Sequence, residues 1–169
     1  MKNVLIAVLV LGVTMLAGVV AAGEPVEDMQ AFEKLKGLAG TWDAKTTDGE
    51  GVIRYRVASA GSVVIEELFP GTDHEMMTVY HMDGDELVAT HYCSAGNQPR
   101  FKLDASTSTG DTLAFGFNGG TNMKPSDGHI HQGSVRLVDA DHVEEEWWFW
   151  KDGKPAHGTT FKMKRRSAE

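Results

Sequence analysis

The chain has 169 residues, 41% of them hydrophobic, and a formal net charge of −8 at pH 7. This length suits one domain with a substantial core, and an acidic surface that repels phosphate backbones argues against nucleic acid as a partner. Because Cys93 is the chain's single cysteine, an internal disulfide is excluded and stability must come from the core.

The first residues have the pattern of an export signal. Lys2 precedes an apolar run of about 19 residues, and the small residues VAA at its end suit cleavage after Ala22. The residues that follow, GEPVED, hold no basic cluster of the kind that stops transfer. We therefore expect a signal peptide at 1–22 and one domain at 23–169, exported to the periplasm or outside the cell without a stable membrane anchor.

The segment PVEDMQAFEKLKGLAG predicts a short amphipathic helix. Met29, Phe32 and Leu35 recur every three residues, and the proline and acidic residues before them are typical of a helix start. Gly37 or Gly40 would end the helix.

Short alternating runs follow the helix, each closed by Gly, Asp, Asn or Pro. The segments TDGE, MDGD, STGD and KDGK supply tight hairpin turns, so successive strands should be antiparallel neighbours. With no helix between strands, the pattern favours an all-β fold, an antiparallel up-and-down barrel of about ten strands with the helix closing one end. A sandwich and an eight-stranded barrel are the alternatives. The predicted strands are 40–46, 50–58, 62–69, 75–82, 86–93, 100–107, 112–117, 129–138, 142–150 and 155–165.

The start of the first strand, GLAGTWDA, is similar to the Gly-x-Trp opening of the calycin barrels, which include lipocalins, fatty-acid-binding proteins and nitrobindin-like proteins. The order of strands also resembles theirs, and together these features indicate an exported calycin of a bacterial type. The resemblance implies that the structural residues Gly40 and Trp42 lie at the closed barrel end. It further implies that Trp42 packs beneath the helix, against Arg165 or Arg166 of the last strand.

Two departures from the calycin families limit what the resemblance implies. Nitrobindin-like chains continue Gly-x-Trp-x-Gly, whereas Ala44 stands in the last place here, and no motif corresponds to their haem histidine. Haem is therefore not predicted as a cofactor. The last strand, TTFKMKRR, also lacks the Arg-x-Tyr of fatty-acid-binding proteins, so their carboxylate site is not transferred.

Alternation along the strands predicts which histidines face the lumen. His129 and His131 share a face with Gly133 and Val135, and we expect this face to be interior. His91 shares a strand face with apolar neighbours in the same way. We expect the three histidines to converge in one cavity.

The His-x-His spacing also fits a metal site, because both imidazoles can reach one ion. His129 and His131 would be two ligands of a zinc-like metal, with His91 as the third, or else Cys93 or His81. The alternative is that these histidines are hydrogen-bonded polar residues that line a wet cavity.

Other polar residues are interpreted more simply. Cys93 is expected to be an interior, inert thiol, and the acids of VEEEWWFW to be exposed strand charges on a strand whose aromatic residues straddle the wall. Arg100 would either anchor an acidic group of the ligand at the rim of the cavity or pair with an acidic side chain.

No motif specifies a reaction, so a binding protein is favoured over an enzyme. The leading hypothesis is a barrel whose lumen holds a small apolar or amphipathic molecule, with His91, Arg100, His129 and His131 as ligand-binding residues. A metal-binding protein or metal-dependent enzyme that uses the His129 and His131 face is the first alternative. A structural or interaction module without a pocket is the second.

Overall fold

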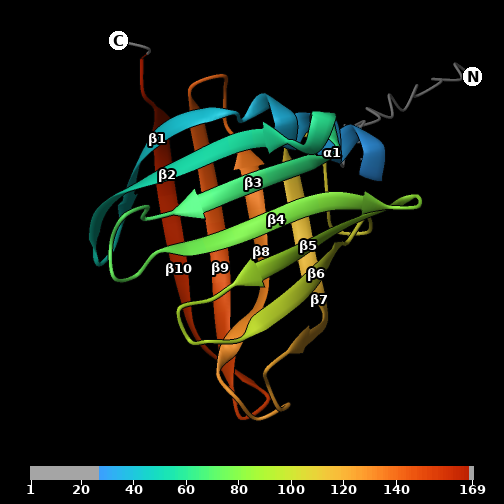
Figure 1. Ribbon diagram of the computed structural model, residues 1–169, viewed down its shortest axis with the longest axis vertical. Helices are drawn as coiled ribbons and strands as arrows, with labels where there is room; N and C mark the ends of the chain where they lie inside the picture. The colour runs from blue at the N-terminus through green and yellow to red at the C-terminus, as the bar shows by residue number, and fades with distance from the viewer. Residues whose placement is uncertain (1–26, 168–169) are drawn as a thin grey trace, which may run out of the picture.

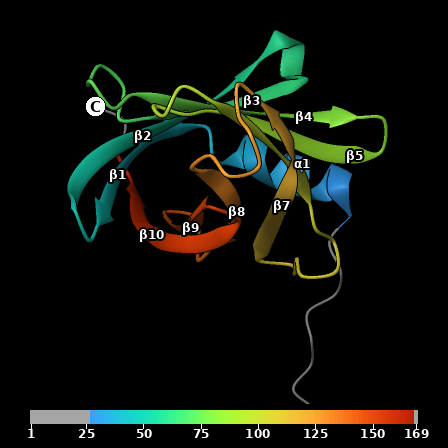
Figure 2. The ribbon, with the colours of Figure 1, turned by 90° about the horizontal axis from the view of Figure 1, so that it is seen from below.

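The computed structural model describes residues 27–167, which form a closed barrel of ten antiparallel strands with one α-helix at an end (Figure 1). Each strand pairs with its neighbours in the chain, and β1 pairs with β10 to close the sheet. Figure 2, seen from below, shows the strands forming a ring with α1 at the far end. The elements are α1 (Asp28–Gly37), β1 (Gly40–Thr46), β2 (Gly49–Ala58), β3 (Val63–Leu68), β4 (Met76–Asp83), β5 (Glu86–Tyr92), β6 (Gln98–Leu103), β7 (Thr112–Thr121), β8 (His129–Leu137), β9 (His142–Lys151) and β10 (Lys154–Arg165), with a 3-10 turn at Ser59–Gly61.

The predicted all-β barrel with a short N-terminal helix is confirmed. Two predicted strands differ from the observed ones by more than one residue at an end: β6 begins and ends earlier than 100–107, and β7 extends beyond 112–117 to Thr121. The predicted signal peptide lies outside the described residues.

The helix α1 packs on the barrel end through Ala31, Phe32 and Leu35, which are all buried. Met29, predicted to share this face, is 54% exposed, so that part of the prediction is wrong. The buried residues are spaced according to the 3.6-residue period of a helix. A strict three-residue repeat drifts away from the buried face within about one turn, which explains why Met29 is exposed. Asp28 fixes the helix to the barrel, because its Oδ2 accepts a hydrogen bond of 2.7 Å from the Leu87 backbone N–H. No helix in residues 27–167 is long and apolar enough to cross a membrane.

Trp42 and Arg165 face each other across the β1–β10 pair that closes the barrel. The Trp42 side chain is fully buried, and its indole N–H donates to the Leu38 carbonyl at 2.9 Å. The Arg165 guanidinium lies 4.2 Å from the centre of the indole ring, close enough for a cation–π interaction.

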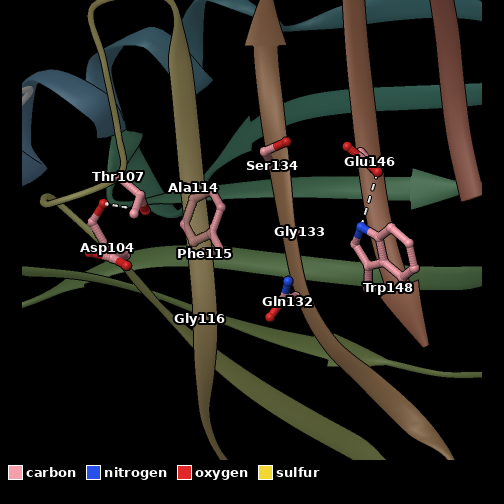
Figure 3. Close-up of a pocket in the computed structure, with 10 residues that line it drawn as sticks. All are labelled: Asp104, Thr107, Ala114, Phe115, Gly116, Gln132, Gly133, Ser134, Glu146 and Trp148. Carbon is pink, nitrogen blue, oxygen red and sulfur yellow. Dashed lines mark hydrogen bonds between the residues drawn. The ribbon is translucent and has the colours of Figure 1, made fainter. Parts of the chain in front are cut away.

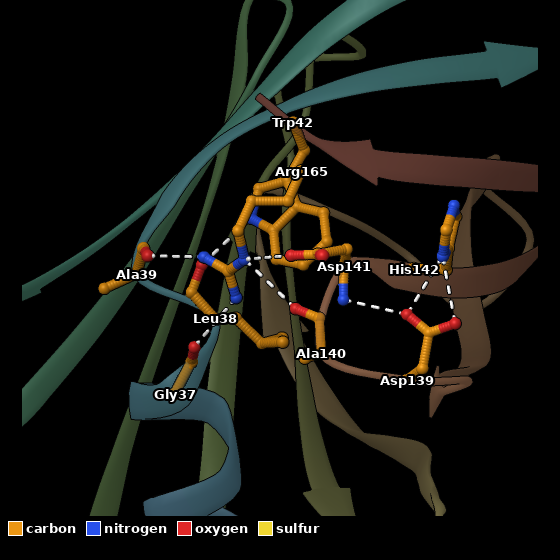
Figure 4. Close-up of polar contacts among 9 residues, drawn as sticks. All are labelled: Gly37, Leu38, Ala39, Trp42, Asp139, Ala140, Asp141, His142 and Arg165. Atoms are coloured by element: carbon orange, nitrogen blue, oxygen red, sulfur yellow. Dashed lines mark hydrogen bonds and ion pairs between the residues drawn. The ribbon is translucent and has the colours of Figure 1, made fainter. Parts of the chain in front are cut away.

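The same guanidinium also binds the end of the helix (Figure 4). Arg165 donates to the Gly37 and Ala39 carbonyls at 3.1 and 2.8 Å, and to Ala140 in the β8–β9 turn at 3.1 Å. Carbonyls at a helix C-terminus have no partner within the helix and carry partial negative charge, so a cation satisfies them well. Of the two arginines suggested by the resemblance, Arg165 is therefore the one at Trp42.

Gly40 leaves room for this contact. Its φ angle of +142° lies in a region that L side chains rarely adopt, and a Cβ added there would stand 2.9 Å from Arg165 Nη1. The Gly-x-Trp spacing thus places a residue without a side chain beside the guanidinium and an indole beneath it.

Replacing Trp42 by alanine should destabilise the fold strongly, because a large buried aromatic ring and the surface beneath Arg165 are lost together. We expect the free energy of unfolding in urea to fall by about 3–5 kcal/mol. Tyr92→Ala is the control, since Tyr92 is 49% exposed, and its loss should cost no more than about 0.5 kcal/mol. Equal effects of the two substitutions would contradict the role given to Trp42.

Candidate ligand pocket in the barrel lumen

A pocket opens into the lumen at the barrel end opposite α1. Strands β5 and β9 run away from the helix, so their last inward residues lie at this end beside the first inward residues of β4 and β10. The pocket has a volume of about 240 Å3. A wider hollow of about 560 Å3 adjoins it, and Met76, Thr159 and Phe161 line both. The residues that line the pocket are Leu68, Met76, Thr78, His91, Cys93, Ser94, Ala95, Ile130, Trp147, Phe149, His157, Thr159 and Phe161.

His91 is the most deeply buried titratable group that lines the pocket, with 6% of its surface exposed. Its Nδ1 lies 3.0 Å from the Thr78 hydroxyl, whereas its Nε2 has no hydrogen-bond partner among the described residues. Burial lowers the pKa of His91 to about 4, because the charged imidazolium is poorly solvated there. At neutral pH the ring is therefore uncharged, with one polar edge left for a molecule in the pocket.

Two fully buried carboxyl groups, Glu66 on β3 and Glu145 on β9, lie in the core of the barrel. Glu145 accepts hydrogen bonds from the Tyr55 hydroxyl and, at 3.1 Å, from the Trp147 indole N–H. Glu66 accepts one from the Tyr80 hydroxyl at 2.9 Å, and its second oxygen has no hydrogen-bond donor among the described residues.

The expectation that the acids of VEEEWWFW are exposed charges is therefore wrong for Glu145. Alternation places Glu145 on the same face of β9 as Val143 and Trp147, and both of these are buried. This parity is the signal in the sequence that identifies the buried acid. Glu144 and Glu146 lie on the outward face, as predicted.

Burial raises the pKa of both acids, and the negative charge of Glu145 raises the pKa of Glu66 further. Two carboxylates that share a dry site do not both ionise easily, so the pair retains a proton. Glu145 receives two hydrogen bonds from neutral donors and is the better-stabilised anion, which leaves the proton on Glu66. Desolvation also raises the pKa values of Tyr55 and Tyr80 above their usual range, so both hydroxyls stay protonated as donors.

The acid pair is connected to the pocket through two of the lining residues. Thr78 lines the pocket and lies opposite Glu66 in the β3–β4 pairing. Trp147 lines the pocket and donates to Glu145. The pocket therefore has a polar floor, formed by His91, Thr78 and the acids behind them, beneath walls that are mainly apolar.

The structure brings His129 and His131 together, but in a different cavity from His91. This cavity, of about 330 Å3, lies between the end of β7 with the loop that follows it and the strands β8 and β9. The Asp127 carbonyl accepts from His129 Nδ1 at 2.8 Å, so His129 Nε2 is the acceptor for His131 Nδ1 at 3.0 Å. The His131 ring stacks on Trp150, with ring centres 3.8 Å apart.

A β-bulge explains why the two histidines do not face the lumen as predicted. Ile130 pairs with Phe149 and Gln132 with Trp148, so His131 is an extra residue that shifts the alternation of β8 by one. Ile130, predicted to share the opposite face, consequently lines the luminal pocket with Phe149. The expected convergence of His91, His129 and His131 in one cavity is therefore not observed.

The remaining candidate residues lie outside the floor of the pocket. Arg100 is exposed on β6 and approaches Gly119, which lines the cavity of His129 and His131. Cys93 is partly buried and lines the luminal pocket. Within residues 27–167, no group of three or more His, Cys, Asp or Glu side chains is arranged to hold a metal ion.

A hollow of about 370 Å3 lies on the outside of the barrel, over β7, β8 and β9 (Figure 3). Trp148 forms one wall; its indole N–H donates to Glu146 at 3.0 Å, and its ring lies against Gly158. The ring covers a strand position that has no side chain of its own, which gives this tryptophan a structural role. We assign no ligand to this hollow.

No protein-family model and no curated protein matches the chain. Among solved structures, Rv2717c from M. tuberculosis is 16% identical with a TM-score of 0.50, and the match covers 81% of this chain and 98% of that one. EF1p2_mFAP2b bound to DFHBI is 14% identical with a TM-score of 0.37, covering 79% and 96%. A DUF3598-family protein of unknown function from Nostoc punctiforme PCC 73102 is 13% identical with a TM-score of 0.41, covering 89% and 53%. The likeness to Rv2717c and the closed antiparallel barrel fit a calycin-like fold.

The buried titratable groups make stability depend on pH in two opposite ways. The pKa of Glu66 is raised above 4.5 in the folded state. Its protonation therefore makes its full contribution to the free energy of unfolding below pH 4.5, and that contribution is lost as the pH rises through the folded pKa. His91 acts in reverse: its pKa falls from 6.5 to about 4, so stability increases with pH across that interval.

Replacing Glu66 by glutamine should isolate the first effect. As the pH rises above the unfolded pKa, the free energy of unfolding of Glu66→Gln should improve relative to the wild type by about 1.4 kcal/mol per pH unit. The contribution of His91 cancels in this difference. Urea unfolding at several pH values from 5 to 8 measures the difference, with Glu67→Gln, on the outward face of the same strand, as the control. A Glu66→Gln difference that does not change with pH would contradict the assignment of the proton.

Proposed function

We propose that the protein is an exported barrel that binds a small apolar or amphipathic molecule in the luminal pocket. The observation that carries the proposal is the Nε2 atom of His91, which is buried, has no partner in residues 27–167, and belongs to a ring that lines the pocket. A buried polar atom without a partner costs free energy, and a bound molecule that hydrogen-bonds to it would recover that cost.

The composition of the pocket supports the same proposal. Aromatic and aliphatic side chains, among them Leu68, Ile130, Phe149 and Phe161, form most of the wall, and the polar lining residues include His91 and Thr78 at the floor. Small-molecule sites in proteins typically combine an apolar lining with a small number of fixed polar groups. The adjoining hollow offers space for a molecule longer than the pocket itself.

Cys93 provides a direct test, since it is the chain's only cysteine and lines the pocket. We expect the neutral probe N-phenyl-1-naphthylamine to bind the native protein with increased fluorescence and to slow the reaction of Cys93 with N-ethylmaleimide. Labelling of native protein should already be slower than labelling of urea-unfolded protein, because the thiol is partly buried. Prior modification of Cys93 should abolish probe binding, because the adduct fills the pocket.

The Cys93→Ser variant is the matched control, because it keeps the pocket open and has no thiol to modify. Treatment with maleimide should leave its probe binding unchanged. Probe binding that survives modification of the wild type would place the site elsewhere. If modification abolishes probe binding only in the wild type, mass spectrometry of molecules that accompany the purified protein would identify the natural ligand.

Export rests on residues 1–22, whose apolar run and small-residue end favour cleavage after Ala22. Expression of the full chain in a Gram-negative bacterium should yield a periplasmic protein whose N-terminal sequence begins at Gly23. Leu11→Arg, which interrupts the apolar run, should leave an uncleaved protein in the cytoplasm. A wild-type protein that keeps residues 1–22 and stays in the cytoplasm would contradict export.

A further inference from the structure

We propose that the luminal pocket and the adjoining hollow form one continuous site for an elongated molecule, whose polar end lies at His91 and whose apolar chain extends out of the lumen against Phe69. This inference rests on the proposed function, which says only that a small apolar or amphipathic molecule binds in the luminal pocket. Three features of the molecule support it: the two cavities share part of their lining, the inner one is small, and a strained backbone turns Phe69 toward the inside of the barrel.

The two cavities adjoin along a common wall. Met76, Thr159 and Phe161 line both of them, so the two spaces meet at these side chains. The inner pocket, of about 240 Å3, is smaller than the roughly 300–1,000 Å3 typical of pockets for drug-sized molecules. Since an apolar cavity of about 150 Å3 holds benzene, the inner pocket suits a short chain. The hollow of about 560 Å3 provides the space for a longer one.

Phe69 forms part of the wall of the hollow because its backbone departs from the alternation of β3. Leu68 is the last inward residue of that strand and is buried, so a regular strand would turn the next side chain outward. Phe69 instead has a φ angle of +53°, in the left-handed region that a bulky side chain rarely adopts. The centre of its ring consequently lies 6.1 Å from that of Phe161, a buried residue of β10.

Gly51 on β2 leaves the space that the Phe69 ring occupies. Alternation along β2 puts Gly51 on the same face as Ile53 and Tyr55, which are both buried. A Cβ added at Gly51 would stand 2.5 Å from two carbons of the Phe69 ring. The ring therefore covers the inner side of β2 at the open end of the barrel.

Hydrogen bonds hold the Phe69 backbone in its strained conformation. Its N–H donates to the Val52 carbonyl at 2.9 Å, and its carbonyl accepts from the Thr72 hydroxyl at 2.9 Å. Backbone strain of this kind persists only where the surroundings hold it, and it is concentrated at functional sites. Here it places an aromatic surface where a chain that starts at His91 leaves the lumen.

A homologous series of n-alkanols tests the length of the site. A hydroxyl group both donates and accepts hydrogen bonds, so it can pair with His91 Nε2 in either tautomer of the ring. Displacement of N-phenyl-1-naphthylamine from the wild type would compare n-hexanol, n-octanol and n-decanol. We expect each pair of added methylenes to strengthen binding about tenfold, because the added carbons leave water for the hollow.

The outcomes of this series separate the inference from the proposed function. Equal affinities for n-octanol and n-decanol would mean that the inner pocket is the whole site, which would overturn the inference and leave the proposed function intact. Failure of every alkanol to displace a probe that Cys93 modification does block would have the same meaning. Probe binding that modification of Cys93 does not affect would remove the proposed function and the inference with it.

Two variants test the place given to Phe69. Phe69→Ala removes the aromatic wall, and Gly51→Ala displaces the ring, so each should weaken n-decanol binding about tenfold and leave n-hexanol binding unchanged. In the Phe69→Ala background, Gly51→Ala should have no further effect, since there is no ring to displace. Gly116→Ala is the control, because a Cβ at this other strand glycine meets nothing within 4 Å. Equal weakening of n-hexanol and n-decanol by Gly51→Ala would overturn the inference.

His91→Leu tests the position of the polar end. It removes one hydrogen bond at the inner end of the site, so it should weaken n-hexanol and n-decanol by the same factor, about fivefold. No effect on either alkanol would overturn the placement of the polar end at His91. Circular dichroism and thermal melting establish that each variant is folded, and the wild-type series decides the question if one is not.

Discussion

Closure of the barrel between its first and last strands is the constraint on which the rest of the structure depends. The β1–β10 pairing sets Arg165 opposite Trp42, and that one guanidinium then stacks on the indole and binds carbonyls at the end of α1. A single side chain thus joins both ends of the sheet to the helix. Because closure uses both sheet edges, the lumen is reached through the ends of the barrel, and α1 covers one of them. The luminal pocket lies at the other end for this reason.

The acid pair is costly for a barrel of this size, whose interior could be filled by apolar side chains alone. Burying Glu66 and Glu145 loses solvation that hydrogen bonds recover only in part, and Glu66 retains an oxygen without a donor in the described residues. What the pair provides is orientation. Trp147 donates to Glu145 and also lines the pocket, so this acid fixes a residue that a ligand would touch.

The sequence predicted the barrel well because its signals are local. Asp-Gly turns and two-residue alternation define each hairpin independently of the others, and Gly40 with Trp42 identifies the closed end. The site was harder to predict because it depends on facts that alternation alone does not contain. One extra residue at His131 reverses the face of everything before it on β8, and nothing in HIHQGSVRLV marks that bulge. Glu145 could have been found from its parity with Trp147, but a charged residue is usually exposed. Its partner, Glu66, is adjacent only in the folded chain.

The histidine and cysteine of THYC illustrate how position along a barrel strand decides what neighbouring residues can do. The inward row of β5, continued by Cys93 just after the strand, runs from the helix to the open end, and its burial decreases in that order: Leu87 is fully buried, His91 is 6% exposed, and Cys93 is only partly buried. Two residues along a strand correspond to about 6.5 Å of depth, so the two side chains occupy successive levels of the pocket. His91 directs Nδ1 to Thr78 on the adjacent strand, not along its own strand toward the thiol. A base and a nucleophile need direct hydrogen-bond contact to react as a pair. The histidine therefore belongs to the floor, where it can bind the polar end of a ligand, and the cysteine to the pocket wall above it.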